Sequence, residues 1–515
     1  MVIDEILGAL EEVELRGGGE QIEIDSISDD SRRVGPGTLF VALRGERFDG
    51  HDFLEAVVEA GAAAVMVDRK WDGKLAVPTL VVEDTRRILG SLGSVFYRRP
   101  SEEMKIIGIT GTNGKTTTTY LLESVCLAGG WKTGVIGTVE YRWGSRREKA
   151  ANTTPDGLVL QRILREMADD GVEVVILEVS SHGLAMGRVD GVRFDVGIFT
   201  NLSQDHLDFH ETMDAYRAAK ALLFTKYLPL SKLKAGKSAV AVINAEDQEG
   251  RALLRSLEQD GEVPVIGHGI ETTEEVVLRG KVIQEGIEGV VLSIRRGEKE
   301  ELEVRSQMPG RFNAENIMGV VATARALNIE VEAIARGLAG SRGVPGRMEP
   351  VVGEFGGPSV FVDYAHTPDA LERALAALRP LTRGNLWVVF GCGGDRDRSK
   401  RPLMGAVAAR GADRMVLTSD NPRREEPAVI IDAIEEGVRE VLSGQEMDRE
   451  GHWARKLERS EAICDAIGRA EENDVILIAG KGHETYQEIN GVRIDFDDRL
   501  VAGEALNQRR RLWKG

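Results

Sequence analysis

The fold is decided by a short stretch, KIIGITGTNGKTT, which runs from Lys105 to Thr117. Its first six residues predict a buried strand, and a helix is expected from about Thr116 to Ala128 after a glycine-rich turn. In such a unit, backbone N–H groups and the helix N-terminus can bind phosphates, Lys115 can neutralise their charge and the Thr116 hydroxyl can ligate Mg²⁺. The stretch therefore predicts a nucleoside triphosphate site formed by Gly111, Thr112, Asn113, Gly114, Lys115, Thr116 and Thr117.

This loop is a shorter variant of the usual G-x-x-x-x-G-K-[ST] pattern, because Ile109 stands where the first glycine is expected. An incidental glycine-rich turn is the alternative interpretation. The strand expected before the loop and the helix expected after it favour the phosphate site.

Outward from this stretch, the chain predicts an α/β protein with three domains. We expect a small α/β unit at residues 1–100, a central domain with a parallel sheet at 101–342 and a Rossmann-like domain at 343–515. The boundaries follow from a proline after a basic pair, at Pro100, and from the stretch SRGVPG around Gly343. Strands are predicted at 37–43, 63–67, 79–82, 105–110, 172–179, 192–200, 360–363, 386–390, 414–418 and 475–479, and further helices at 52–60 and from 85 to about 98.

The composition is that of a globular enzyme, with 42% hydrophobic and 29% charged residues in 515. Lysine and arginine total 66 against 84 acidic residues, and the net charge of −18 disfavours a nucleic-acid or anionic-membrane surface. The three cysteines are far apart and lack metal-ligand spacing. The N-terminus is acidic, and no apolar run approaches the length of a membrane span. We therefore expect a cytoplasmic protein.

Two polar clusters follow predicted parallel strands. Glu178 begins the stretch EVSSH, and His206 lies in NLSQDHLD. The carboxyl ends of parallel strands gather ligands at one edge of a sheet, so these side chains predict a metal site beside the phosphate loop. Taken singly, each cluster reads more simply as a loop of hydrogen-bonding caps. Lys220, in the helical stretch YRAAKALLF, reads from periodicity alone as a solvated lysine.

The motifs GTNGKTT, EVSSH, NLSQDHLDFH, YRAAK, GRFNAEN, VPGRME, DYAHTPDAL, GCGGDRDRSKRP, SDNPR and GKGHE occur in this order over nearly the whole chain. The chain thereby resembles the Mur ligases of peptidoglycan precursor synthesis, and among them the subfamily that uses diaminopimelate. The resemblance implies an ATP-dependent amide ligase that adds meso-2,6-diaminopimelate to UDP-N-acetylmuramoyl-L-alanyl-D-glutamate. ATP would phosphorylate the D-glutamate carboxylate, and the amine would attack the acyl phosphate.

The resemblance also implies roles for individual residues. Lys115, Glu178, His206 and Lys220 match the catalytic positions, and Lys220 matches a lysine that the family converts to a carbamate. Thr116, Glu178, His206 and carbamylated Lys220 match ligands of Mg²⁺ ions. Adenosine and phosphate contacts in the ATP site are implied, beyond the glycine-rich loop, for Asn313, Asn316, Arg347 and Asp363.

Two further ligand sites come from the same resemblance. The UDP-linked substrate matches Ser31, Glu46, Arg47, Phe48, Asn152, Thr153, Thr154, Ser180 and Arg188, with Met186 standing where some members have a glutamine. Diaminopimelate matches Arg396, Asp420, Asn421, Pro422, Arg423, Gly480 and Glu484. Diaminopimelate differs from lysine by a second carboxylate, which a guanidinium such as that of Arg423 recognises through two hydrogen bonds.

Two alternative functions follow from the same motifs. A related amide ligase such as a folylpolyglutamate synthetase would share the phosphate loop and the modified lysine, but the N-terminal unit and the DNPR motif argue against it. A nucleotide-binding regulatory protein of this fold would not need Lys115, Glu178, His206 and Lys220 together. We expect a monomer.

Overall fold

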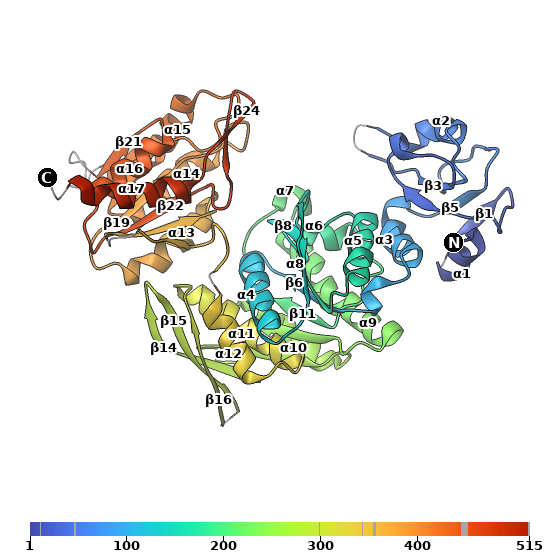
Figure 1. Cartoon of the computed structure of the whole chain (residues 1–515), viewed down its shortest axis with the longest axis horizontal. Coiled ribbons are helices and arrows are strands. Elements are labelled where there is room, and N and C mark those ends of the chain that lie inside the picture. Colours follow the sequence, from blue (N-terminus) through green and yellow to red (C-terminus); the bar gives the residue numbers. More distant parts are fainter. Residues whose placement is uncertain are drawn as a thin grey trace. The chain divides into compact units, whose positions relative to one another are not determined.

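The computed structural model describes residues 1–512 except 11, 46–47, 298, 342, 354–356 and 444–451. The chain forms β-sheets with parallel and antiparallel strands, and helices flank the sheets (Figure 1). The chain divides into two compact units. One contains Met1–Arg279, Arg296–Glu298 and Met318–Gly337, and the other contains Gly280–Arg295, Lys299–Ile317 and Leu338–Gly515. The α/β class is confirmed, whereas the boundaries at residues 100 and 342 stay predictions.

The first unit begins with a five-stranded sheet in the order β1-β5-β4-β3-β2, with β1 antiparallel to β5 and the other neighbours parallel. Alternate residues of its strands face opposite sides. Leu39 and Val41 belong to one buried cluster, while Phe40 and Ala42 belong to the other. Its elements are α1 (Ile3–Ala9), β1 (Glu14–Arg16), β2 (Ser26–Ser28), β3 (Thr38–Val41), α2 (Leu54–Glu59), β4 (Ala64–Asp68), β5 (Thr79–Val82) and α3 (Thr85–Phe96).

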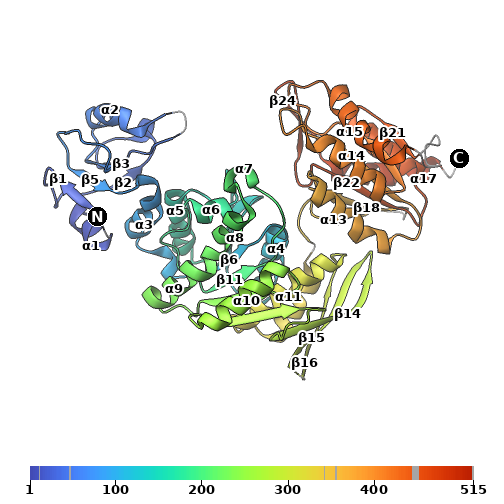
Figure 2. The ribbon, with the colours of Figure 1, turned by 180° about the vertical axis from the view of Figure 1, so that it is seen from behind.

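Helix α3 joins this sheet to the rest of the first unit. It lies beside α5 (Gly157–Asp169) in both views (Figure 1, Figure 2). Glycines allow the close approach: a Cβ on Gly157 would lie 2.7 Å from the backbone nitrogen of Gly90, and a Cβ on Gly90 would lie 2.4 Å from the carbonyl oxygen of Asp190. The two sheets of this unit are therefore connected by tight helix packing.

The second sheet of this unit has the predicted strand β6 (Lys105–Thr110) at its centre. Its neighbours β10 (Val174–Glu178) and β11 (Val196–Phe199) are parallel to it, so all three strands end at one edge of the sheet. These strands are continuous apolar runs because helices cover both faces. Among the strands that lie wholly in this unit, the order is β13-β12-β11-β6-β10-β7-β8-β9, with β7 (Thr133–Ile136), β8 (Glu140–Trp143), β9 (Arg146–Lys149), β12 (Val240–Asn244) and β13 (Val265–Gly269).

The helices of this region include α4, which begins at Lys115 directly after the glycine-rich loop. The bounds are α4 (Lys115–Ala128), α6 (Ser181–Ala185), α7 (Leu207–His210), α8 (Met213–Leu222), α9 (Leu228–Ala235), α10 (Gln248–Asp260) and α12 (Val331–Gly340). Among the described residues, no helix combines the length and the apolar character needed to cross a membrane.

The second unit contains a six-stranded sheet in the order β17-β18-β22-β19-β20-β21, parallel except for β17. One buried cluster covers each face of this sheet. Some elements belong partly to this unit and partly to the first, among them β14 (Leu278–Gly286), β15 (Gly289–Arg296) and α11 (Arg311–Ala326). The strands and α-helices that lie wholly in this unit are β16 (Lys299–Ser306), β17 (Glu349–Val351), β18 (Ser359–Asp363), α13 (Pro368–Leu378), β19 (Leu386–Phe390), α14 (Lys400–Gly411), β20 (Arg414–Leu417), α15 (Pro427–Leu442), β21 (Trp453–Arg455), α16 (Arg459–Arg469), β22 (Val475–Ala479), β23 (Tyr486–Ile489), β24 (Val492–Asp495) and α17 (Asp498–Leu512).

Helices α14 and α15 pack almost backbone to backbone. A Cβ on Gly437 would lie 1.8 Å from the Pro402 carbonyl oxygen. Gly437→Ala should therefore lower the free energy of unfolding by about 1–3 kcal/mol through overpacking, although alanine favours an isolated helix. Gly468→Ala in α16 is the matched control, since its Cβ would meet nothing within 4 Å. Chemical unfolding of both variants checks the contact, and equal stability of the two would contradict it.

Candidate active site

The glycine-rich loop lies between β6 and α4, where the strands β6, β10 and β11 end. Its conformation requires glycine at two positions. Gly111 has φ +146° and a Cβ there would lie 1.9 Å from the Thr200 hydroxyl oxygen, while Gly114 has φ +83° as the N-cap of α4. The Lys115 ammonium donates hydrogen bonds to the carbonyl oxygens of Gly111 (2.8 Å) and Thr112 (2.9 Å). The side chain is thereby folded back over the loop that would surround a phosphate.

The segment after β11 fixes this loop from the side. The Asn113 backbone N–H donates to the Asn201 side-chain oxygen (2.9 Å), and the Asn201 side-chain N–H donates to the Asn113 carbonyl (3.2 Å). The Thr200 hydroxyl also donates to the Asn113 carbonyl, at 2.6 Å. Asn201 belongs to the stretch NLSQDHLD, which the sequence pattern predicts to be a source of metal ligands. In the structure its side-chain amide instead binds the backbone of Asn113 in the phosphate loop.

Glu178 ends β10 and is 1% exposed. Its Oε2 accepts hydrogen bonds from the hydroxyls of Thr116 (3.1 Å) and Thr138 (2.9 Å), and its Oε1 accepts one from the Thr138 N–H (3.2 Å). Thr116 and Glu178, which are both predicted to bind Mg²⁺, are therefore in contact with each other, and their role as metal ligands stays a prediction. A hydroxyl and a carboxylate are oxygen donors, and Mg²⁺ is typically bound by one or two such groups together with substrate phosphates. The donor set fits Mg²⁺.

Lys220 is buried, with 2% exposure, so the interpretation as a solvated lysine is wrong. Its ammonium donates to the Gly111 carbonyl (2.7 Å) and lies 4.5 Å from the centre of the Tyr216 ring. Burial and the nearby charge of Lys115 hold the pKa of Lys220 well below its usual value. The two predicted catalytic lysines thus donate to the same carbonyl oxygen, that of Gly111.

His206 is more exposed than Glu178 and Lys220. Its side chain is 47% exposed, its Nε2 lies 3.4 Å from an oxygen of Asp205, and its ring centre lies 4.9 Å from that of His182. The described residues hold no group of three or more histidine, cysteine, aspartate or glutamate side chains arranged for a metal. A role of His206 in a second metal site stays a prediction.

Several residues predicted for the UDP-linked substrate are connected to Glu178 by hydrogen bonds. The Thr138 and Thr153 hydroxyls lie 3.1 Å apart, and the Thr154 hydroxyl donates to the Glu178 carbonyl (2.9 Å) and contacts the Ser180 hydroxyl (3.1 Å). The Arg188 guanidinium donates to the Thr154 carbonyl, at 2.9 Å. Asn152 is exposed at the start of this segment.

Arg188 and Met186 also line a cavity of about 80 Å³ together with residues of the N-terminal sheet region, namely Asp29, Leu43, Arg86 and Leu89. Ser31 follows Asp29 closely, at the start of a short 3-10 helix, Ser31–Arg33. The cavity therefore joins Arg188 to the part of the N-terminal sheet region that lies two residues before Ser31.

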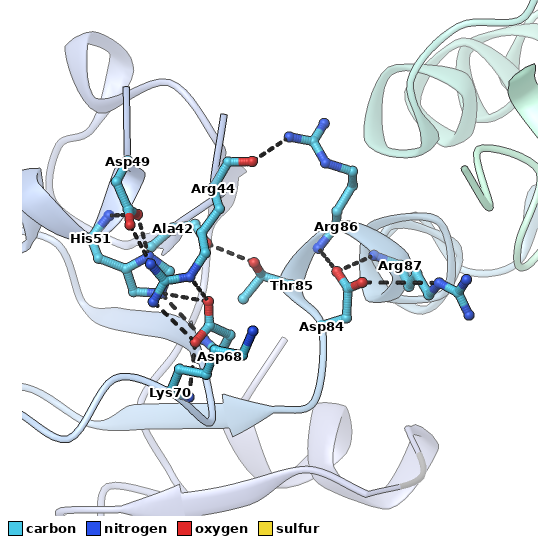
Figure 3. A network of polar contacts seen from close by, with 10 residues as sticks. All are labelled: Ala42, Arg44, Asp49, His51, Asp68, Lys70, Asp84, Thr85, Arg86 and Arg87. Atoms are coloured by element: carbon cyan, nitrogen blue, oxygen red, sulfur yellow. Dashed lines mark hydrogen bonds and ion pairs between the residues drawn. The ribbon is translucent and has the colours of Figure 1, made fainter. Parts of the chain in front are cut away.

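Three more residues predicted for the UDP-linked substrate, Glu46, Arg47 and Phe48, lie in the segment between Arg44 and Gly50. Arg44 bonds the carboxylates of Asp68 and Asp49 (2.5 Å each), and Asp49 contacts the His51 ring at 2.6 Å (Figure 3). These hydrogen bonds hold Arg44 at the start of the segment and Asp49 near its end. Phe48 is 74% exposed, and Glu46 and Arg47 lie outside the described residues.

The remaining residues predicted for ATP lie in the second unit. Asn313, in α11, is fully buried and donates to the Pro309 carbonyl (2.7 Å), and Asn316 donates to Asn313 (3.4 Å). Asp363 ends β18 and accepts from the backbone N–H groups of Met348 (2.7 Å) and Ala365 (2.8 Å). The Arg347 guanidinium lies 4.6 Å from the centre of the Tyr364 ring.

The residues predicted for diaminopimelate gather where the strands β19, β20 and β22 end. Asp420 is buried, and burial raises its pKa. A Cβ on Gly480 would lie 2.4 Å from the Asp420 carboxylate. Asn421 donates to Glu484 (2.8 Å), Pro422 is buried beside it, and the Arg423 guanidinium donates to the Gly394 carbonyl (2.7 Å). Arg396 is exposed on the loop that contains Gly394.

Sequence reasoning missed three residues of these clusters. Thr138 bonds Glu178, Tyr216 contacts Thr112 through its hydroxyl (3.1 Å), and the fully buried Lys481 donates to Asn421 and Glu484 (3.2 Å each). Thr138 follows β7, so the rule that ligands gather beyond parallel strands could have identified it. Burial of Tyr216 and Lys481 depends on tertiary packing, for which the sequence gives no local signal.

Family models match three parts of the chain: "Mur ligase family, catalytic domain" at residues 23–97, "Mur ligase middle domain" at 109–324 and "Mur ligase, glutamate ligase domain" at 346–482. The chain is 44% identical to UDP-N-acetylmuramoyl-L-alanyl-D-glutamate–2,6-diaminopimelate ligase of Geobacillus kaustophilus, over 95% of this chain and 96% of the relative. It is 42% identical to the protein of the same name from Geobacter metallireducens, over 96% of each chain.

Solved structures agree with these matches. A structure of a UDP-N-acetylmuramoyl-L-alanyl-D-glutamate–2,6-diaminopimelate ligase shares 32% identity and a TM-score of 0.72, over 99% of both chains. A folylpolyglutamate synthase from Mycobacterium tuberculosis shares 19% identity and a TM-score of 0.58, over 76% of this chain and 91% of that one. The second likeness shows the fold alone.

Proposed function

The chain belongs to the Mur ligase family, and from this premise we propose that it joins meso-2,6-diaminopimelate to UDP-N-acetylmuramoyl-L-alanyl-D-glutamate with the energy of ATP. The product would be the tripeptide precursor used in peptidoglycan synthesis. The observation that supports this proposal most strongly is the cluster of Asp420, Asn421, Arg423 and Glu484, which places groups of both signs for an amino acid with two carboxylates and two amines.

The reaction proceeds in two steps. The D-glutamate carboxylate attacks the γ-phosphorus of ATP, which forms an acyl phosphate and releases ADP. An amine of diaminopimelate then attacks the acyl carbon, and the tetrahedral intermediate expels inorganic phosphate and loses a proton to leave the amide. No covalent bond to the enzyme is needed.

The chain contributes mainly positioning and charge. Lys115 and the N–H groups of residues 111–116 bind the phosphates, and the adenosine part is assigned to Asn313, Asn316, Arg347 and Asp363. Thr116 and Glu178 would hold Mg²⁺, with His206 and carbamylated Lys220 at a second ion. Bound Mg²⁺ supplies positive charge to the transferred phosphoryl group.

The UDP-linked dipeptide is assigned to Ser31, the segment from Arg44 to Gly50, and residues 152–154, 180 and 188. Product analysis by mass spectrometry tests the assignment of substrates. Incubation with ATP, Mg²⁺, the UDP-linked dipeptide and meso-diaminopimelate should give the tripeptide, and L-lysine in its place should give little product. Efficient use of lysine, or of a folate and glutamate, would contradict the proposal.

Arg423→Ala should raise the KM for meso-diaminopimelate at least about tenfold, because a charge-assisted hydrogen bond to the distal carboxylate contributes about 1.5–3 kcal/mol. Lysine should gain little, since Arg396 and Asp420 still shape the pocket for the longer ligand. Steady-state kinetics with both amino acids check this expectation.

Arg424→Ala is the matched control for Arg423→Ala, because Arg424 is the exposed neighbour on the same loop. Its KM for diaminopimelate should stay within about twofold of the wild-type value. An unchanged KM in Arg423→Ala would show that Arg423 does not recognise the second carboxylate, and the choice of amino acid would have to be revised.

A further inference from the structure

An ion pair between a buried arginine and a largely buried glutamate lies next to the loops that carry the residues assigned to diaminopimelate. The Arg401 side chain is 2% exposed, and its two terminal nitrogens donate to the two carboxylate oxygens of Glu425 at 3.1 and 2.9 Å. Neither residue belongs to the predicted ligand contacts. Because charged side chains are costly to bury, a pair in this position calls for a structural or functional reason.

The pair connects two loops, which we define as the first loop, residues 391–399, and the second loop, residues 419–426. Arg401 also donates to the Gly393 carbonyl of the first loop (3.4 Å), and Glu425 accepts the Asp395 backbone N–H (2.6 Å). Arg398 of the first loop adds a further contact with Glu425, at 3.1 Å. The Glu425 carboxylate of the second loop thus contacts Asp395 and Arg398 of the first loop and Arg401, which follows that loop in α14.

Direct contacts between the loops surround the ion pair. The Gly394 N–H donates to the Asn421 carbonyl (2.9 Å), and the Arg423 guanidinium donates to the Gly394 carbonyl (2.7 Å). A Cβ on Gly394 would lie 1.9 Å from the Pro422 carbonyl oxygen. The position of the Arg423 guanidinium therefore depends on where the first loop lies.

Both loops are also strained at one residue. Asp395 has φ +50° and Arg423 has φ +53°, in the left-handed region that residues with a side chain seldom adopt. Such conformations persist only where surrounding contacts impose them. The ion pair lies next to Asp395 in space and two residues from Arg423 in sequence.

The pair is anchored to a rigid part of the fold. Arg401 lies in the first turn of α14, and Glu425 lies two residues before α15 begins. These helices are locked together at Gly437 and at Gly405, where a Cβ would lie 2.1 Å from the Ile434 carbonyl oxygen. The hydrogen bonds from Arg401 hold the pKa of Glu425 at about 2, so the carboxylate stays ionised.

We propose that Arg401 and Glu425 are positioning residues that transmit the fixed geometry of α14 and α15 to the two loops, and thereby set the affinity for the amino acid with a second carboxylate. The inference rests on the function proposed above. A recognition site must be held within a fraction of an ångström by groups that are themselves fixed. This pair binds the residues on either side of Gly394, to which Arg423 donates.

Two variants test the pair. Arg401→Lys keeps the positive charge of the side chain and loses the bidentate hydrogen bond to Glu425. Glu425→Gln keeps the shape of the side chain and loses its negative charge. Each should raise the KM for meso-diaminopimelate at least about tenfold, while the KM values for ATP and for the UDP-linked dipeptide change less than about twofold. KM does not depend on the fraction of folded enzyme, so partial misfolding cannot imitate this result.

Asp474→Asn is the matched control for a buried carboxylate in the same unit. Asp474 accepts from the Trp387 indole N–H (2.9 Å) and the Asn385 N–H (2.7 Å), and it precedes β22, whereas the diaminopimelate residues follow the end of that strand. This variant should lower the melting temperature without changing the KM for diaminopimelate. If Arg401→Lys gives no folded protein, the nearly isosteric Glu425→Gln decides the question.

The outcomes separate the inference from the function on which it rests. Wild-type enzyme that makes product, together with variants whose KM for diaminopimelate is unchanged or whose three KM values rise alike, would overturn the positioning role alone. Wild-type enzyme that makes no product from diaminopimelate would overturn the proposed function and this inference with it. A selective rise in the KM for diaminopimelate supports both.

Discussion

Lys115→Ala should lower kcat by about 10²–10³-fold, because the transferred phosphoryl group loses a cation aimed at the charge that it gathers in the transition state. The ammonium of Lys115 lies within 2.9 Å of two carbonyl groups of the phosphate loop. The loop itself is held by Thr200 and Asn201, whose hydrogen bonds to Asn113 do not involve Lys115. The variant should therefore fold normally.

Circular dichroism and turnover, measured on the same preparation, check this prediction. Lys105→Ala is the matched control, because Lys105 is an exposed lysine at the start of the same strand, β6. It should keep nearly full activity. Near-normal turnover in a folded Lys115→Ala variant would contradict the assignment of the phosphate loop.

Lys220→Ala should lower activity by a comparable factor, and short carboxylates such as acetate should restore part of it. The lysine is buried against the Gly111 carbonyl, and its depressed pKa favours the neutral amine that reacts with carbon dioxide to give a carbamate. A carbamate is an anion and could bind a metal ion that an ammonium would repel. A small carboxylate would occupy the space left by alanine.

Activity as a function of added acetate or formate measures this rescue. Lys232→Ala, an exposed lysine of α9, is the control and should show neither loss nor rescue. Electron density for an unmodified ammonium at Lys220, in crystals grown near neutral pH with bicarbonate, would count against the carbamate.

The sequence predicted several buried strands at their observed bounds but missed others, among them the fully buried β7 and β12. β6, β5, β19 and β22 have the predicted bounds, because strands covered on both faces are continuous apolar runs. Strand β9 consists of Arg146, Arg147, Glu148 and Lys149, and it forms only because β8 offers an edge. No local pattern of these four residues distinguishes such a strand from a solvated loop.

Local sequence pattern also identifies only some of the residues of the candidate active site. Glycines of tight turns and residues at the ends of strands, such as Gly111 and Glu178, could be located from local pattern because backbone geometry determines their positions. Lys220 and Arg401 could not, since a lysine in a helix and an arginine in a charged motif read as solvated groups. Their burial results from segments far apart in the sequence, and only the folded chain shows it.

The most direct test of the proposed reaction follows the oxygen atoms of the substrate. The UDP-linked dipeptide, labelled with ¹⁸O at both oxygens of the D-glutamate side-chain carboxylate, is incubated with ATP, Mg²⁺ and meso-diaminopimelate, and both products are analysed by mass spectrometry. Phosphate should acquire one labelled oxygen, and the tripeptide should retain the other in its new amide. Phosphate without label, or label in AMP, would contradict activation of the carboxylate as an acyl phosphate.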